Sequence, residues 1–466
     1  MRVLLVESGV AAPDRFVYQC YPPHGLMYLA AFLRDRRPGH EQKIIDLMAL
    51  RSGADAIDNV LREFSPDLVA IHAMSFQSKC MHQIAARVKA WNPRGVVAVG
   101  GPHPSAAPDQ TLADPNINLA ASGEGEETYV ELVDRVAAGA DLAGIPGSAV
   151  RRDGQVQSGP ERPFIADLDT LPFPAWDLVD LRAYFTDVMP NQNDITHRRE
   201  VTTIFTSRAC PFGCIFCHNL FGKKFRARSV GNVLDEMEAL RDRGVRELHL
   251  IDDCFNSDLD RARAIMRGIR ERRLDLKLAF PNGLRGDRLP DDLLDLMVAA
   301  GVYKMNFGVE SGSPRVQKLI RKGLSLDAIK DGISRAAARG IFTHGFFMLG
   351  FPGETAAEME QTIAFACATD LHTAGFALLS PFPGTEVHHM ALEMGKTIDY
   401  DPDDTSYMRL SANLTAETDD TVRRMHHRAH WKFYASPRRV ARILTTMPHP
   451  TDFVRSGLRH FRLKFL

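Results

Sequence analysis

The sequence predicts an α/β protein in three parts: an N-terminal doubly wound sheet of the flavodoxin type, a partial (β/α) barrel, and a C-terminal helical region. Two observations predict this fold class. Short apolar runs alternate with helical patterns along residues 1–395, and polar or glycine-rich motifs follow the apolar runs. This alternation is typical of parallel sheets with crossover helices, whose ligands bind at the carboxyl ends of the strands.

Residues 1–150 have the pattern of an open doubly wound sheet. Strands are expected at residues 2–7, 43–46, 68–72 and 96–101, with a further unit around residues 120–126. Helices are expected at residues 25–33, 56–64 and 84–91. The loops after the strands place small and polar residues in one crevice, namely Ser75, Phe76, Gly100, Gly101, His103, Gly123 and Glu124. Any ligand of nucleotide size fits such a crevice.

The alternation resumes at residues 197–396, after a linker at residues 151–196. Apolar runs at residues 247–253, 305–312 and 343–354 are interpreted as strands that end in carboxylates or glycines. Helices expected at residues 289–300 and 326–339 are each followed by glycine, a common helix stop. The pattern predicts a partial barrel with its polar motifs gathered at one edge of the sheet.

Cys210, Cys214 and Cys217 place three thiols in one short loop. Three cysteines can hold three irons of a [4Fe–4S] cube and leave the fourth iron open to an outside ligand. A zinc site is the alternative, but it needs a fourth ligand, and His218 directly follows Cys217, which is poor geometry. A buried group of unreactive cysteines is less consistent with the scattered positions of the other cysteines, Cys20, Cys80, Cys254 and Cys367.

The spacing C-x3-C-x2-C, with an aromatic residue before the last cysteine, resembles the signature of radical S-adenosylmethionine (SAM) enzymes. The resemblance implies that SAM contacts Phe216, Asp252, Asp253, Glu310, Gly350, Phe351 and Gly353. It assigns the SAM ammonium to Asp252 or Asp253, and the ribose to Glu310. These carboxylates also fit helix capping or salt bridges. The sequence departs from the family at Ala209, where glycine is commoner, and in having Asp252 and Asp253 in place of a Gly-Gly-Glu element.

The resemblance extends to radical SAM enzymes with a cobalamin-binding domain. It rests on residues 22–26, the loops at 100–103 and 123–126, and the linker at 168–174. It covers most of residues 1 to about 395. It implies that cobalamin lies in the crevice of the first sheet, near the residues named above for that crevice. The Asp-x-His-x-x-Gly motif that donates a histidine to cobalt is absent, so binding without a histidine ligand is expected. A scaffold domain without a corrinoid is the alternative.

The resemblance implies an enzyme in which a [4Fe–4S] cluster cleaves SAM to a 5′-deoxyadenosyl radical, which abstracts hydrogen from an unactivated C–H bond. C-methylation through methylcobalamin, in a specialised or lipid pathway, is the favoured reaction. Rearrangement, cyclisation or oxidation without methyl transfer is the first alternative, and a corrinoid carrier or sensor is an alternative of another class. A small-molecule or lipid substrate and an electron donor such as flavodoxin or ferredoxin are expected, whereas the catalytic residues are not identifiable.

Composition and the C-terminal sequence bear on partners and location. A net charge of −1 and a pI near 7.0 do not indicate nucleic-acid binding. No signal peptide or membrane-spanning run is expected, and free thiols with a cluster predict the cytoplasm. Residues 397–420 are acidic and are expected to cap the barrel. Residues 423–466 are basic and aromatic, which fits helices packed on the barrel or peripheral contact with the inner membrane face.

Overall fold

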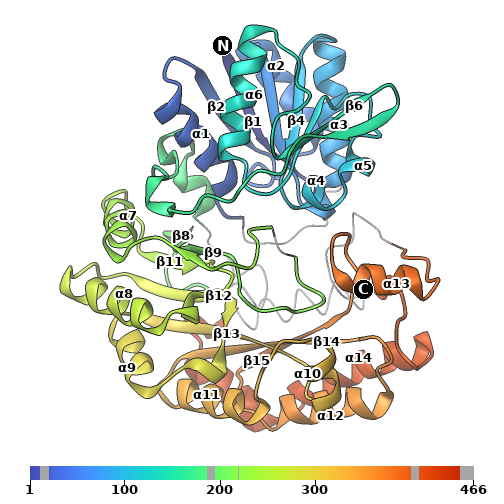
Figure 1. Ribbon diagram of the computed structural model, residues 1–466. Helices are drawn as coiled ribbons and strands as arrows, with labels where there is room; N and C mark the ends of the chain where they lie inside the picture. Colours follow the sequence, from blue (N-terminus) through green and yellow to red (C-terminus); the bar gives the residue numbers. More distant parts are fainter. Residues whose placement is uncertain (11–19, 186–194, 219, 400–408, 452–466) are drawn as a thin grey trace.

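The computed structural model describes residues 1–10, 20–185, 195–218, 220–399 and 409–451. Within these residues the chain forms two units, each built on a largely parallel sheet, with helices at the C-terminal end (Figure 1). The predicted fold class is therefore confirmed.

The N-terminal unit contains a seven-stranded sheet in the order β2-β1-β3-β4-β5-β6-β7. The first five strands are parallel, and β6 and β7 extend the edge in antiparallel pairing. Apolar side chains pack in two clusters of this unit, as expected for a parallel sheet covered by helices on both faces. Its elements are β1 (Arg2–Glu7), α1 (His24–Arg36), β2 (Glu41–Asp46), α2 (Ile57–Phe64), β3 (Leu68–His72), α3 (Ser78–Trp91), β4 (Val96–Gly100), α4 (Pro102–Ala106), α5 (Pro108–Thr111), β5 (Leu119–Ala121), α6 (Glu126–Ala138), β6 (Ser148–Arg152) and β7 (Gln155–Ser158).

The second unit contains a six-stranded, fully parallel sheet in the order β15-β14-β13-β12-β11-β8, with a separate two-stranded ribbon of β9 and β10. Its helices line the outer side of the sheet (Figure 1). The elements are β8 (Val201–Ile204), β9 (Ser207–Arg208), β10 (Arg226–Ala227), α7 (Val230–Asp242), β11 (Glu247–Leu250), α8 (Leu259–Glu271), β12 (Lys277–Leu284), α9 (Asp291–Ala299), β13 (Val302–Glu310), α10 (Pro314–Leu319), α11 (Leu326–Ala338), β14 (Phe342–Leu349), α12 (Ala356–Cys367), β15 (Thr373–Leu378) and α13 (Glu386–Glu393).

Element boundaries differ from expectation in a few places. β11 ends at Leu250, so Asp252 and Asp253 lie in the following loop rather than in the strand. The helix expected from residue 289 begins at Asp291, because Pro290 occupies the N-cap position with extended backbone. The first sheet continues to Ser158, beyond the predicted start of the linker.

Two helices close the described chain, α14 (Asp419–Tyr434) and α15 (Pro437–Thr446). They pack on the barrel through buried side chains such as Phe433. Their basic residues bind acids of the barrel: Arg428 lies 2.8 Å from Glu360, and Arg442 lies 2.6 Å from Asp370. Part of the basic tail is therefore paired with acids of its own domain, which favours the packing alternative.

Residues 452–466, which complete the expected basic and aromatic tail, lie outside the described residues. A search of the described helices finds none long and apolar enough to cross a membrane. The described part of the acidic segment contacts the barrel, because the carbonyl of Leu414 accepts a hydrogen bond from the N–H of Gly353 at 2.8 Å.

Candidate active site

The cysteine loop leaves the barrel at β9 and returns at β10, which pair antiparallel at its base. Ala209, the first residue of the loop, has a φ of 72°. This left-handed conformation is unfavourable for a residue with a Cβ and is easily adopted by glycine. The geometry explains why glycine suits this position, and the loop holds alanine in a strained conformation.

The loop polarises two of its thiols. A hydrogen bond from the Cys254 thiol lowers the pKa of Cys210 to about 6. A hydrogen bond from the Cys217 thiol lowers the pKa of Cys214 and raises that of Cys217. Metal ligation requires thiolates, so the lowered pKa values of Cys210 and Cys214 suit the expected cluster, whereas Cys217 would have to lose its proton on binding iron. In the described residues no three His, Cys, Asp or Glu side chains converge on one metal ion. A cube needs no such convergence, because each cysteine binds a different iron.

The two aspartates after β11 differ in their surroundings. Asp252 is 2% exposed, and its carboxylate accepts hydrogen bonds from the Thr206 N–H at 2.6 Å and the Ser207 hydroxyl at 2.7 Å. Asp252 thereby fixes the chain that leads into the cysteine loop. Asp253 is exposed at the same turn.

Glu310 ends β13 with a φ of 68°, a second strained residue at this edge. Its carboxylate is buried and lies 2.5 Å from the Lys322 ammonium. Burial opposes the charge of Lys322, but Glu310 outweighs burial and raises the Lys322 pKa. A Cβ on Gly308 would lie 2.5 Å from the Lys322 nitrogen, so glycine leaves room for this pair.

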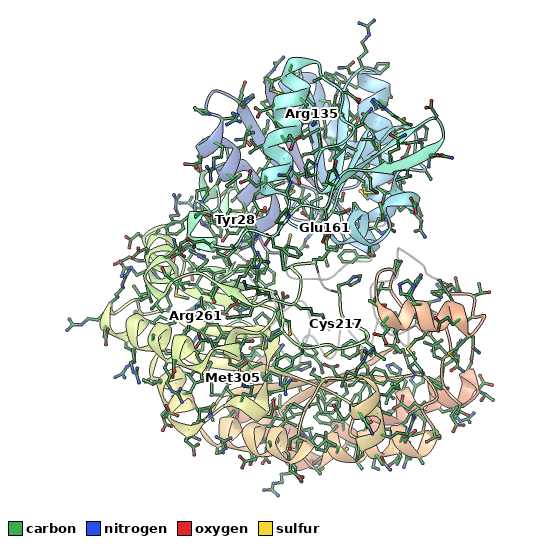
Figure 2. All side chains as sticks on the ribbon, in the orientation of Figure 1. Tyr28, Arg135, Glu161, Cys217, Arg261 and Met305 are labelled. Atoms are coloured by element: carbon green, nitrogen blue, oxygen red, sulfur yellow. The ribbon has the colours of Figure 1, made fainter. Side chains whose placement is uncertain are left out.

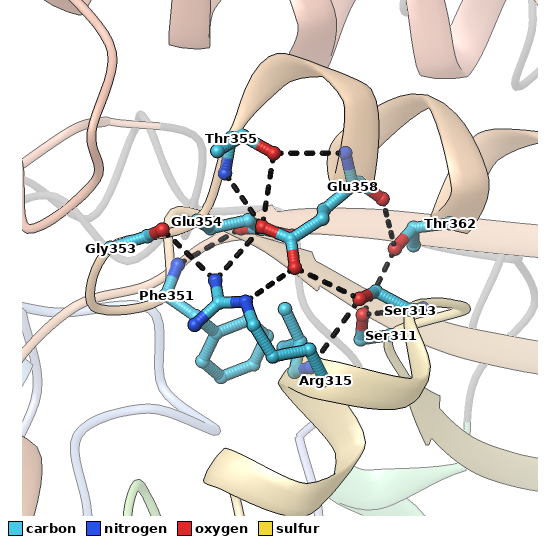
Figure 3. Close-up of polar contacts among 10 residues, drawn as sticks. Ser311, Ser313, Arg315, Phe351, Gly353, Glu354, Thr355, Glu358 and Thr362 are labelled. Carbon is cyan, nitrogen blue, oxygen red and sulfur yellow. Dashed lines mark hydrogen bonds and ion pairs between the residues drawn. The ribbon is translucent and has the colours of Figure 1, made fainter.

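The glycine-rich loop after β14 is held rigidly (Figure 3). The Glu354 carboxylate accepts hydrogen bonds from the N–H groups of Gly350 at 2.7 Å and Phe351 at 3.0 Å. Arg315 donates to the Gly353 carbonyl at 2.9 Å and pairs with Glu358, which also caps α12. The structure thus fixes the backbone expected beside adenine.

Phe216 of the cysteine loop lies next to this glycine-rich loop. Its ring centroid is 6.0 Å from that of Phe351, and both belong to one apolar cluster. The structure therefore brings Phe216, Phe351 and the cysteines together, although they come from distant parts of the chain.

The residues expected near cobalamin follow β3, β4 and β5. Gly101 has a φ of 105°, and a Cβ there would lie 2.6 Å from the His72 ring and 3.0 Å from the Ala73 carbonyl. Gly123 has a φ of 74°, and its N–H donates to the Ser105 hydroxyl at 3.1 Å. Glycine at position 101 therefore lets the loop after β4 pack closely on the residues that end β3. Ser75 and Phe76 form a 3₁₀ turn after β3, and Gly100 ends β4.

The histidines near this edge are buried or hydrogen-bonded to other side chains. His103 is 6% exposed, and burial, with His82 close by, lowers its pKa to about 4. His72 pairs with Glu7 at 2.8 Å. His24 is buried against the second unit, where its Nε2 lies 2.6 Å from the Thr203 hydroxyl.

Glu124, the remaining residue expected near cobalamin, is also buried. It binds Arg208 and Arg226, one from each strand at the base of the cysteine loop. It thus joins the two units.

Three residues near the cysteines were not expected from the sequence: Cys254, Arg285 and Lys322. The Arg285 guanidinium lies 4.0 Å from the centroid of the Phe212 ring in the cysteine loop, and donates to the Lys322 carbonyl at 2.9 Å. Arg285 and Lys322 lie well beyond the cysteine motif in sequence, and neither belongs to a recognisable motif. Cys254 directly follows Asp252 and Asp253, and this adjacency could have indicated from the sequence that Cys254 lies near the cysteine loop.

Comparisons with known proteins agree with this geometry. The family model for the B12 binding domain matches residues 15–133, and the model for the Radical SAM superfamily matches residues 204–366. An uncharacterized methyltransferase of Pyrococcus horikoshii is 32% identical over 443 residues, which cover 94% of this chain and 93% of that protein. The cytidylyl-2-hydroxyethylphosphonate methyltransferase of Streptomyces wedmorensis is 33% identical, with 87% and 84% covered.

Solved structures show the same fold. The radical SAM methyltransferase TsrM of Kitasatospora setae, with cobalamin and a [4Fe–4S] cluster bound, superposes with a TM-score of 0.69 at 22% identity, covering 84% of this chain and 75% of that one. The cobalamin-dependent radical SAM enzyme OxsB, with aqua-cobalamin bound, has a TM-score of 0.75 at 17% identity, with 92% and 66% covered. Both domains and the extended relatives place this chain in the family of cobalamin-dependent radical SAM methyltransferases.

Proposed function

We propose that this protein transfers a methyl group to an unactivated carbon of a small-molecule substrate. One observation carries the proposal: loops after strands of both parallel sheets meet. Glu124, after β5, binds the base of the cysteine loop, and a Cβ on Gly384, after β15, would lie 3.3 Å from that of Ala106. Ligands of parallel sheets bind at these strand ends, so two cofactor sites face each other here.

Cys210, Cys214 and Cys217 would hold the cluster, and Cys217 lies between the two units (Figure 2). When bound, the cluster and cobalamin supply electron transfer to SAM and methyl transfer, respectively. We assign the SAM ribose to Glu310, held by Lys322, and the adenine to the Phe216 side of the loop with Gly350, Phe351 and Gly353. Asp253 is our choice for the ammonium, because the Asp252 carboxylate already binds Thr206 and Ser207.

Cobalamin would lie against Ser75, Phe76, Gly100, Gly101 and Gly123, without a histidine ligand. The inward burial of His103 and the pairing of His72 with Glu7 support this assignment. We place the domain boundaries at residues 1–158, a linker at 159–196, the barrel at 197–396 and the C-terminal region at 397–466. The first boundary differs from the expected residue 150 because β7 extends the first sheet to Ser158.

Only the names of its relatives bear on the substrate class of this protein. One acts on a cytidylylated hydroxyethylphosphonate, and a relative at 27% identity in Rubrivivax gelatinosus is named an anaerobic magnesium-protoporphyrin IX monomethyl ester cyclase. The latter keeps cyclisation as the second candidate. A reductant such as flavodoxin or ferredoxin in the cytoplasm would supply electrons. The ion pairs of the described tail with the barrel, such as Arg442 with Asp370, favour packing on the barrel over membrane contact and a lipid substrate.

Anaerobic reconstitution followed by mass spectrometry of the SAM products tests the proposal. S-adenosylhomocysteine together with 5′-deoxyadenosine is expected when a methyl acceptor is present. 5′-Deoxyadenosine alone, with a consumed substrate, would favour cyclisation or oxidation. Absence of both products in protein that carries cluster and cobalamin would contradict a radical SAM reaction.

A further inference from the structure

Two arginines face each other at the base of the cysteine loop. Arg208 lies in β9, directly before the loop, and Arg226 lies in β10, directly after it. The two residues are partners across the ribbon, and both are buried. Whatever binds these guanidinium groups therefore holds both ends of the loop that carries the cysteines.

A single carboxylate of the N-terminal unit binds both arginines. Glu124 Oε1 accepts from Arg208 Nη1 at 2.9 Å and from Arg226 Nη1 at 2.8 Å. Its Oε2 accepts from Arg226 Nη1 at 3.0 Å and from the N–H of Ile165 at 2.7 Å. Glu126 binds the second Arg208 nitrogen at 2.5 Å, so two carboxylates balance two guanidinium groups.

Aromatic rings shield this cluster from water. The Arg208 guanidinium lies 5.5 Å from the Tyr28 ring and 5.3 Å from the Phe221 ring, and Arg226 lies 5.0 Å from the Phe164 ring. Tyr28 lies at the junction of the two units (Figure 2). Buried, charge-assisted hydrogen bonds of this kind impose a specific geometry, because removal of one partner leaves another charge unpaired.

The position of Glu124 links the two cofactor sites. Gly123, which precedes it, shapes the crevice expected to hold cobalamin. Both Glu124 oxygens are already occupied by protein donors, which leaves little capacity for a corrinoid amide. We propose that Glu124 is a positioning residue, which ties both ends of the cysteine loop to the crevice, rather than a ligand of cobalamin. This inference rests on the cluster and cobalamin sites of the proposed function.

Glu124→Gln tests the inference, because it keeps the shape and removes the charge. We expect hydroxocobalamin affinity within about twofold of wild type and loss of iron to a chelator at least about fivefold faster. Glu127→Gln, at an exposed residue of α6, the helix that begins two residues after Glu124, is the matched control and should change neither. General destabilisation of the fold would weaken both cobalamin binding and iron retention. Loss of iron retention with unchanged cobalamin affinity therefore distinguishes a positioning role from a general effect on folding.

Weakened hydroxocobalamin binding with normal iron retention would instead make Glu124 a ligand of cobalamin and overturn the proposal. Wild-type cobalamin affinity together with wild-type iron retention would also overturn it. If Glu124→Gln does not fold, the neutral pair Glu124→Gln with Arg226→Gln replaces it, and wild-type iron retention in that variant also overturns the proposal. Wild-type protein that holds no cluster at all would contradict the proposed function itself, before Glu124 is tested.

Discussion

The strand ends of the two sheets face each other but present different chemistry. The barrel edge carries charged groups that are already paired or hydrogen-bonded, including Asp252, the pair of Glu310 with Lys322, and Glu354. The N-terminal edge also has paired charges, Glu7 with His72 and Glu124 with two arginines, but its loops turn on glycines with positive φ at Gly101 and Gly123. A charged, compact ligand such as SAM needs fixed charges, whereas a large flat ligand needs open backbone. The predictions below test this division.

The largest effect is expected at the cysteine loop. Replacement of Cys210, Cys214 and Cys217 by alanine should abolish the iron–sulfur absorbance and SAM cleavage, because no thiolate ligand remains. Hydroxocobalamin binding should persist, since the glycine edge belongs to the other unit. Cys367→Ala, in α12, is the control and should retain the cluster. Wild-type iron and sulfide in the triple variant would disprove the cluster assignment.

A smaller effect is expected at Glu310. Glu310→Gln should keep the cluster and weaken SAM binding roughly 10- to 100-fold, as expected for a lost charge-assisted hydrogen bond of about 1.5–3 kcal/mol. Isothermal titration with SAM measures this. Glu386→Gln, which removes an exposed ion pair with Arg321, is the control and should leave affinity unchanged. Unchanged affinity in folded Glu310→Gln would move the ribose contact elsewhere.

The glycine-rich loop should make stability depend on pH. Burial raises the pKa of Glu354 to about 7. An acid with a raised pKa in the folded state binds more protons when folded, so its contribution to stability falls as pH rises from its ordinary value, near 4.5, to about 7. The loss of stability across this range is about 3 kcal/mol.

Urea unfolding at pH 5 and pH 8 measures this loss. Glu354→Gln cannot ionise, so its stability should fall less than that of wild type between the two pH values. Parallel pH profiles for the two proteins would show that Glu354 does not titrate in this range.

The smallest effect is expected at His103. His103→Ala should leave hydroxocobalamin affinity within about twofold, because a side chain buried away from a ligand contributes little to its binding. Electron paramagnetic resonance of the cob(II)alamin form should show no nitrogen splitting from a histidine. Such a splitting, lost in His103→Ala, would assign a cobalt ligand to the N-terminal edge and remove the contrast between the two edges.

Local sequence patterns predicted much of the fold. The strands Arg2–Glu7 and Leu68–His72 lie where the apolar runs placed them, and Glu310 ends its strand as expected. These features depend on neighbouring residues, through strand periodicity and helix stops, so they can be read without knowing the partners. The barrel partners of the basic tail, such as Asp370 for Arg442, were not predicted, because they lie far away in the chain.

The sequence by itself determined the chemistry of this protein: three cysteines in one loop, carboxylates and glycines at strand ends, and the order of the two units. Tertiary structure alone decided how those groups are used. Lys322 reaches Glu310, and Glu124 turns from the crevice to Arg208 and Arg226. The physical reason is that a buried charge must find a partner, and only the folded chain determines which distant residue supplies it.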